Sequence, residues 1–285
     1  MRILLTAPVY ISQDVHYDFI KETIDSIVTK YEYDVVLVNN YIKQGYEQKV
    51  KNLCSTLLSN PLGNNVSSAW NEGIKYGLAN GFDYVFIINL DIIFNPEAID
   101  NLVAFAEKNG RNKLYTCSEW QNRSTIKAID IVDNGEALEL HTIKSDDVWQ
   151  YSDEHPHFSC FAVTKEFIEA MEKYEQGLKE TKPGYFDTNF NKAYFEDQDY
   201  HQRILIAKAN GVDVNAIKVN SAVFYHYGSR TIKSDEQLEL ENNINYELNR
   251  QYFKTKFGYD SHGQVPTNDE RVKMGYKTPF NEPRQ

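Results

Sequence analysis

Three short stretches place acidic, imidazole and cationic side chains where apolar segments end. The first is Asn89 to Asp91. The second is Gly184 to Arg203, which carries Glu196, Asp197 and Asp199, and the third is Phe224 to Arg230, which carries His226. An Asp and a His are suitable ligands for a divalent metal, and crowded carboxylates can make one of their number a useful proton acceptor. A cationic loop beside them suits phosphate. Together the three stretches predict a metal site with a general base and an anion-binding loop.

Each stretch also has a simple structural explanation. A strand often ends in a polar turn, and a lone His is often a hydrogen-bonded structural residue. Carboxylates in the first turn of a helix interact favourably with the helix dipole, by about 0.3–1 kcal/mol each. The functional hypothesis gains weight because all three stretches bound a strand or open a helix, so they can meet at one sheet edge.

Buried strands are predicted to position these residues. The apolar run from Tyr84 to Ile88 predicts a strand buried on both faces, and Asp91 follows its end. Asn95 and Pro96 then predict a helix start, as N-cap and first helical residue. Ligands of open α/β folds bind at the carboxyl ends of such strands. Further strands are predicted at 3–7, 35–38, 114–118, 126–132, 137–143, 158–163 and 222–226, with helices at 19–28, 44–58, about 66–81, 165–174, 195–210 and 234–257.

The alternation of strands and helices predicts an α/β fold with a mostly parallel central sheet and helices on both faces. We expect a main domain over residues 1–230, made of two halves at 1–110 and 111–230. Residues 231–285 are expected to form a helical extension and a tail packed on the body.

The composition and charge of the chain argue against several classes of protein. The chain has 285 residues and a formal net charge of −11, which argues against a broad electrostatic grip on nucleic acid. No apolar run reaches about 18 residues, and the N-terminus lacks the pattern of a signal peptide. Three cysteines without close spacing argue against a disulfide framework or a zinc site and favour a reducing compartment, which predicts a cytoplasmic location.

The order of the motifs resembles that of family 2 glycosyltransferases, which have the GT-A, Rossmann-like fold. The segment NPLGNNVSSAWNEGI approximates the family's N-x-G-x-x-x-A-x-N-x-G-I, and NLDI followed by Pro96 matches its D-x-D-like strand end. GYFDTNF running into FEDQD and Arg203 matches a further family motif, and His226 to Ser229 approximates H-x-x-x-S, one residue short. The resemblance covers about residues 1–230, and it implies that 1–110 is the nucleotide-sugar-binding half and 111–230 the acceptor-binding half.

The resemblance implies an inverting hexosyl- or pentosyltransferase that depends on Mn²⁺ or Mg²⁺. Asp91 and His226 would hold the metal, Asp197 would be the catalytic base, and Trp149, Glu196 and Asp199 would bind the acceptor. The donor would be a nucleotide-diphosphate sugar, with a UDP-sugar favoured. The residues implied in donor binding are Pro8, Val9, Tyr10, Asn39, Asn65, Asn71, Asn89, Leu90, Asp91 and Arg230.

The sequence departs from the family pattern at three positions. Asn39-Asn40 stands where the family usually has an Asp that contacts the nucleotide base, Asn89 replaces the first acid of the D-x-D, and Cys160 stands where small residues are usual. The tail resembles that of glycosyltransferases from large viruses and phages, for which the location would be the host cytoplasm. A glycan, a protein and a modified nucleobase therefore all stay open as acceptors.

Two rival functions remain. A sugar nucleotidyltransferase would carry a motif resembling G-x-G-x-R near its N-terminus, and residues 1–10 contain none. A non-catalytic module that kept the fold to bind a glycan or a protein partner is supported by the amide at Asn89.

Overall fold

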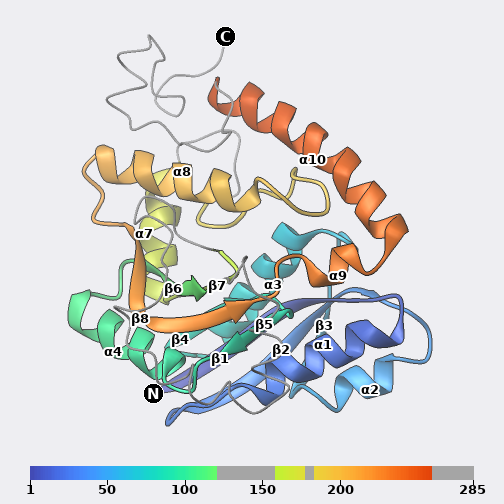
Figure 1. Ribbon diagram of the computed structural model, residues 1–285. Helices are drawn as coiled ribbons and strands as arrows, with labels where there is room; N and C mark the ends of the chain where they lie inside the picture. The colour runs from blue at the N-terminus through green and yellow to red at the C-terminus, as the bar shows by residue number, and fades with distance from the viewer. Residues whose placement is uncertain (121–157, 177–182, 259–285) are drawn as a thin grey trace.

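The computed structural model describes residues 1–120, 158–176 and 183–258 (Figure 1). The strands predicted at 126–132 and 137–143, Trp149, and the tail from residue 259 lie outside the described residues. None of the described helices combines the length and apolar character needed to cross a bilayer.

The described strands form one sheet of eight strands in the order β3-β2-β1-β4-β7-β6-β8-β5. Strands β3, β2, β1 and β4 pair in parallel, as predicted for the N-terminal half. Strand β7 is antiparallel to both β4 and β6, and β5 is antiparallel to β8, so the second half is mixed. The strands are β1 (Arg2–Ile11), β2 (Glu32–Ile42), β3 (Thr56–Ser59), β4 (Tyr84–Ile88), β5 (Ile92–Phe94), β6 (Leu114–Trp120), β7 (Cys160–Val163) and β8 (Ala216–His226).

Helices cover both faces of the sheet (Figure 1). One hydrophobic cluster joins the sheet to α1, α2 and α4, and a second joins its other face to α3, α7 and α8. The helices are α1 (Asp14–Asp25), α2 (Glu47–Lys51), α3 (Val66–Ala79), α4 (Ala98–Asn109), α7 (Lys165–Glu175), α8 (Glu196–Ala209), α9 (Arg230–Lys233) and α10 (Glu236–Phe257).

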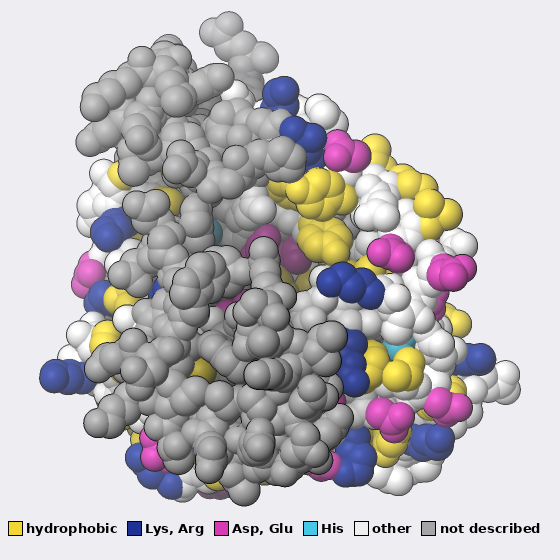
Figure 2. All heavy atoms as spheres, in the orientation of Figure 1, with side chains coloured by type: hydrophobic (Ala, Val, Ile, Leu, Met, Phe, Trp, Pro, Cys, Tyr) yellow, Lys and Arg dark blue, Asp and Glu magenta, His cyan; other side chains and the backbone are white. Residues whose placement is uncertain are grey.

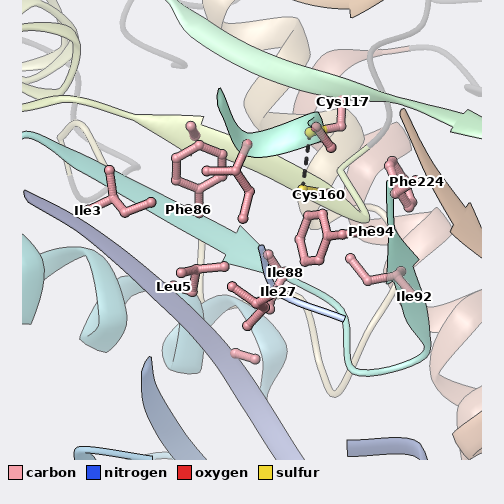
Figure 3. Packing of buried hydrophobic residues seen from close by; sticks show 14 of the residues in the cluster. Ile3, Leu5, Ile27, Phe86, Ile88, Ile92, Phe94, Cys117, Cys160 and Phe224 are labelled. Carbon is pink, nitrogen blue, oxygen red and sulfur yellow. Dashed lines mark hydrogen bonds between the residues drawn. The ribbon is translucent and has the colours of Figure 1, made fainter. Parts of the chain in front are cut away.

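Strand β4 lies at the centre of this arrangement. Phe86 and Ile88 face the cluster with α4 (Figure 3). Val85 and Ile87 face the cluster with α3 and α7. Because both faces are covered, the strand is a continuous apolar run without alternation. On the α3 side, a Cβ at Gly73 would clash with the Thr6 side chain, so glycine lets α3 pack closely on β1.

Two sequence predictions of local structure were wrong. The helix predicted at 44–58 is the five-residue α2, after which Thr56–Ser59 pairs with β2 as an edge strand. Pairing with an existing strand thus overrides local helix propensity. The helix expected to open at Pro96 begins at Ala98, although the Asn95 side chain still accepts a hydrogen bond from the Glu97 N–H.

All three cysteines are free, as the prediction of no disulfide framework requires. Cys117 on β6 and Cys160 on β7 nevertheless become neighbours in the core, with their sulfur atoms 3.3 Å apart (Figure 3). Burial raises the pKa of the Cys160 thiol well above its ordinary value.

Candidate active site

A cavity of about 520 Å³ opens at the carboxyl ends of β1 and β4, under the start of α8 and beside α9 and α10. Figure 2 shows acidic side chains in a recess of this face, beside a group of hydrophobic side chains. The cavity brings together residues from all three stretches that the sequence singled out. Of the predicted site residues, those that line it are Pro8, Tyr10, Asn89, Leu90, Asp91, Glu196, Asp197 and His226.

Asp91 and His226 lie side by side in this cavity. The antiparallel pairing of β5 with β8 sets Ile92 opposite His226, which brings the imidazole to the turn that carries Asp91. His226 Nε2 lies 3.2 Å from Asp91 Oδ1. On the other side of the ring, Nδ1 lies 3.1 Å from Oε1 of Glu119, which is buried at the end of β6. The imidazole is therefore held between two carboxylates.

The two carboxylates determine the protonation of His226. Burial alone lowers the pKa of the imidazole, but the hydrogen bonds and charges of Asp91 and Glu119 raise it to about 10. A carboxylate only accepts hydrogen bonds, so Nδ1 carries a proton toward Glu119. At neutral pH Nε2 also carries a proton, which faces Asp91, and a metal ion bound there would displace that proton.

This arrangement fits a divalent metal. A carboxylate oxygen and a ring nitrogen converge, and a buried carboxylate orients the imidazole from behind, as in many metal sites. Within the described residues, no group of three or more His, Cys, Asp or Glu side chains could hold a metal. Among the described residues, Asp91 and His226 would be the two ligands, and metals such as Mg²⁺ often complete their coordination with water and substrate phosphates.

A tight loop crosses over Asp91. Asp91 Oδ2 accepts a hydrogen bond from the Arg230 N–H at 3.0 Å, and the Asp91 carbonyl accepts one from the Tyr227 N–H at 3.1 Å. The loop turns through positive φ angles at Gly228 (72°) and Ser229 (60°). Arg230 itself does not line the cavity, because its guanidinium pairs with Glu22 at 2.9 Å and stacks on an aromatic ring of α1.

The first turn of α8 carries Glu196 and Asp197 into the cavity. Asp197 is half-buried, whereas Glu196 is 5% exposed, and its Oε2 has no hydrogen-bond partner among the described residues. Burial, and then repulsion from Asp197, raise the pKa of Glu196 well above its ordinary value. Glu196 is therefore suited to remain neutral beside an ionised neighbour, an arrangement that can separate acid and base roles.

Asp199, two residues further on, faces away from the cavity and is fully buried. Its Oδ1 lies 2.5 Å from Lys256 Nζ, and its Oδ2 lies 3.3 Å from an Arg203 nitrogen. Arg203 also makes a two-pronged ion pair with Glu175, at 2.7 and 2.6 Å. The structure thus gives Asp199 ion-pair partners in the protein interior, where the sequence prediction had assigned it to the acceptor.

Besides Arg230, four residues predicted to bind the donor do not line the cavity. Asn65 caps α3 by accepting from the Ser68 N–H at 2.8 Å, and Asn71 hydrogen-bonds both ways with the backbone of Phe186. Asn40 and Asn64 line the cavity where Asn39 and Asn65 were predicted. Successive strand residues face opposite sides, so sequence alone could not decide between Asn39 and Asn40. Val9 is buried in the core.

Sequence reasoning missed several cavity residues. Lys192, Tyr194, Leu238 and Asn242 line the cavity, and Lys192 pairs with Glu241 of α10. The helix expected to form an extension therefore builds part of the wall. Asn242 is 2% exposed, but an Asn inside a charged helix carries no sequence signal of burial.

One comparison with known proteins identifies a family, and another identifies the fold. The model of the family described as Glycosyl transferase family 2 matches residues 7–171. No curated protein matches the sequence. The solved structure of a mannosyltransferase from Pyrobaculum calidifontis, PcManGT, in complex with GDP-Man and Mn²⁺ aligns with a TM-score of 0.50 and 14% identity, over 79% of this chain and 56% of that chain.

A second solved structure, GalNAc-T7 with UDP, GalNAc and Mn²⁺, aligns with a TM-score of 0.51 and 11% identity, over 79% of this chain and 43% of that chain. This chain thus matches about half the length of each neighbour. At such identity the likeness shows the fold, which is the GT-A fold predicted from the sequence.

Proposed function

Because this chain belongs to glycosyl transferase family 2, we propose that it transfers a sugar from a nucleotide-diphosphate donor to an acceptor hydroxyl. One observation carries the proposal. A single cavity gathers a candidate metal pair, Asp91 and His226, and a candidate base, Asp197, from three segments far apart in the sequence. Each of these groups suits one requirement of glycosyl transfer.

The donor would occupy the side of the cavity formed by β1, β2 and the turn after β4. Tyr10, Asn40 and Asn64 supply an aromatic ring and amides there, which suit a nucleoside. Asp91 and His226 would hold Mn²⁺ or Mg²⁺, whose chemical contribution when bound is to neutralise charge on the leaving diphosphate. The two solved neighbours contain GDP-Man or UDP together with Mn²⁺, which supports a nucleotide-sugar donor. A UDP-sugar is the favoured choice.

Asp197 would act as the general base. A hydroxyl is a weak nucleophile at neutral pH, and transfer of its proton to a positioned carboxylate typically contributes about 10²–10⁴-fold in rate. Attack from the face opposite the leaving diphosphate gives inversion at the anomeric carbon. Glu196, kept neutral by burial, would donate a hydrogen bond to the acceptor beside Asp197.

The test measures release of nucleoside diphosphate from UDP-glucose, UDP-N-acetylglucosamine and GDP-mannose, each with Mn²⁺. We expect the wild-type protein to release nucleotide from one of these donors, and the Asp197→Asn variant to bind that donor without releasing nucleotide at a comparable rate. Equal release by both proteins would remove Asp197 from the mechanism.

A second candidate function rests on Asn89, which lines the cavity as a neutral amide at the first position of the D-x-D-like motif. An amide binds a divalent cation less strongly than a carboxylate does. A non-catalytic glycan- or partner-binding module would tolerate that loss. Such a module would bind a nucleotide sugar or glycan and release no nucleoside diphosphate under the same assay.

A further inference from the structure

The segment from Asn191 to Phe195 adopts a backbone conformation that L-residues avoid. Three of the four non-glycine residues with positive φ in the described part of the chain lie here, namely Lys192 (57°), Tyr194 (79°) and Phe195 (73°). Such conformations persist where the surrounding structure enforces them, and they cluster at functional sites. The segment runs directly into Glu196 and Asp197, so its backbone sets where the candidate base enters the cavity.

One side chain, Asn249 of α10, holds most of this segment. Asn249 is 1% exposed. Its Oδ1 accepts a hydrogen bond from the Asn191 N–H at 2.8 Å. Its Nδ2 donates to the carbonyl oxygens of Asn191 at 2.9 Å, Ala193 at 2.9 Å and Tyr194 at 3.1 Å. A single amide therefore satisfies backbone groups on both sides of Lys192 and the carbonyl of Tyr194.

The same face of α10 supports the segment with aromatic contacts. Tyr246 packs against Tyr194 and Phe195, with ring centroids 5.5 and 5.1 Å apart, and Phe253 lies 5.8 Å from Phe195. Residues 246, 249 and 253 share one face because they are three and four residues apart. Hydrophobic contact fills this space, but it does not pair backbone N–H and C=O groups, which Asn249 does.

We propose that Asn249 is a positioning residue, which fixes the strained 191–195 backbone and through it the direction of Asp197. The proposal rests on the proposed function, because it assigns Asn249 a role through the base. An asparagine is required here because the segment presents both a donor and several acceptors, and only a side-chain amide matches both. Aspartate has the same shape and keeps the acceptor, but it loses every donated bond.

Asn245 provides a matched control. It lies one turn earlier on α10, is half-buried, and donates a single bond to the Glu241 carbonyl within its own helix, at 2.6 Å. The experiment compares Asn249→Asp, Asn249→Ala and Asn245→Ala with wild type. Hydrogen–deuterium exchange of the 190–198 amides reports the backbone without any substrate. Nucleotide release from the fastest donor of the UDP-glucose, UDP-N-acetylglucosamine and GDP-mannose panel reports kcat and KM, with water as the acceptor.

For both Asn249 variants we expect faster exchange over 190–198, a kcat about 10- to 100-fold lower, and a donor KM within twofold of wild type. The reason is that Asp91 and His226 lie on other elements, whereas displacement of a reacting group by about 1 Å can cost about 10²-fold in rate. The Asn245→Ala variant should match wild type in all three measurements.

Distinct outcomes separate failure of this proposal from failure of the proposed function. If the wild type releases nucleotide and a folded Asn249 variant keeps full kcat, the positioning role is overturned. If both Asn249 variants lose their cooperative unfolding transition, Asn249 serves overall stability and the proposal is likewise overturned. If the wild type releases no nucleotide, the proposed function fails, and unchanged exchange in the Asn249 variants would then separately reject the anchoring of the segment.

Discussion

Two groups of charged side chains lie on opposite sides of the first turn of α8. The paired cluster, on the side away from the cavity, consists of Glu175, Asp187, Asp199, Arg203 and Lys256. The cavity group consists of Asp91, Glu119, Glu196, Asp197 and His226. Asp197 and Asp199 are two residues apart in sequence and belong to different groups.

The two groups differ chiefly in pairing. Asp197 and His226 are half-buried, and the other members of both groups are buried. In the paired cluster every carboxylate contacts Arg203 or Lys256, and Arg203 grips Glu175 with two hydrogen bonds. In the cavity group the carboxylates outnumber the cation, and Glu196 Oε2 has no partner among the described residues. A buried charge that is paired within the protein has a structural role, whereas a buried carboxylate oxygen without a protein partner is typical of a binding site.

The largest expected effect tests the cavity group. Asp197→Asn keeps the shape of the side chain but removes the proton acceptor, so the rate of nucleotide release should fall by about 10²–10⁴-fold. Donor affinity, measured by calorimetry, should change little. A variant that keeps more than a tenth of the wild-type rate would place Asp197 outside the chemistry.

The next effect tests the paired cluster. Arg203→Leu removes the cation from Glu175 and one of two cations from Asp199, and breaking a buried pair typically costs about 3–5 kcal/mol of unfolding free energy. Urea denaturation followed by circular dichroism measures that loss. A change below about 1 kcal/mol would show that the cluster is not held by this arginine, and the contrast between the groups would fail.

A smaller effect concerns the orientation of His226. Glu119→Leu removes the carboxylate that fixes the imidazole, and loss of such a partner typically weakens metal binding about 10–100-fold. Titration calorimetry with Mn²⁺ measures the change. Glu119→Gln, which can still accept the Nδ1 hydrogen bond, should lose less. Equal affinity in all three proteins would argue against a metal at Asp91 and His226.

The smallest effect contrasts the pH dependence of the two groups. Burial raises the folded-state pKa of Glu196, so its ionisation destabilises the fold at pH values above its unfolded pKa of about 4.3. Glu196→Gln should therefore stabilise the protein near pH 7.5, by about 0.5–2 kcal/mol. The gain should disappear as the pH falls toward 4, where both forms are neutral.

The folded-state pKa of Asp187 shifts in the opposite direction to that of Glu196. Burial acts to raise its pKa, but the charge and hydrogen bond of Lys256 outweigh burial, so the folded-state pKa lies below the ordinary value. Its stabilisation is complete above about pH 4 and is lost as the pH falls through the folded pKa. Asp187→Asn should thus lower the unfolding temperature at pH 7.5. If both variants shift stability in the same direction, the distinction between the groups is contradicted.

The sequence predicted the strand ends of the cavity better than its interior contacts. Asp91, Asp197 and His226 follow or open apolar elements, and that local signal located them. Glu119 escaped notice because its partner His226 is 107 residues away, and the pairing of β6 with β8 depends on the whole sheet. Asn249 escaped notice because an Asn inside a charged helix looks like a solvated surface residue.

Asp199 shows most clearly what could not be predicted from the sequence. Its position in the first turn of α8 matched that of Asp197, and sequence gave no sign that Arg203 and Lys256 converge on it from two helices. Likewise, whether Asn39 or Asn40 faces the cavity depends on the twist and pairing of β2, which a short apolar run does not specify. Local pattern thus identified the elements, and long-range packing decided which side chains reach the cavity.

We propose that the cavity binds a nucleoside diphosphate and a metal ion through Asp91. Thermal unfolding of the wild type and of Asp91→Asn, with UDP or GDP and with or without Mn²⁺, tests it most directly. A ligand at about 100 times its Kd adds about 2.7 kcal/mol to stability. We predict a clear rise in unfolding temperature for the wild type that requires Mn²⁺ and nucleotide together, and its loss in Asp91→Asn. The same rise in both proteins, or none in either, would contradict the claim.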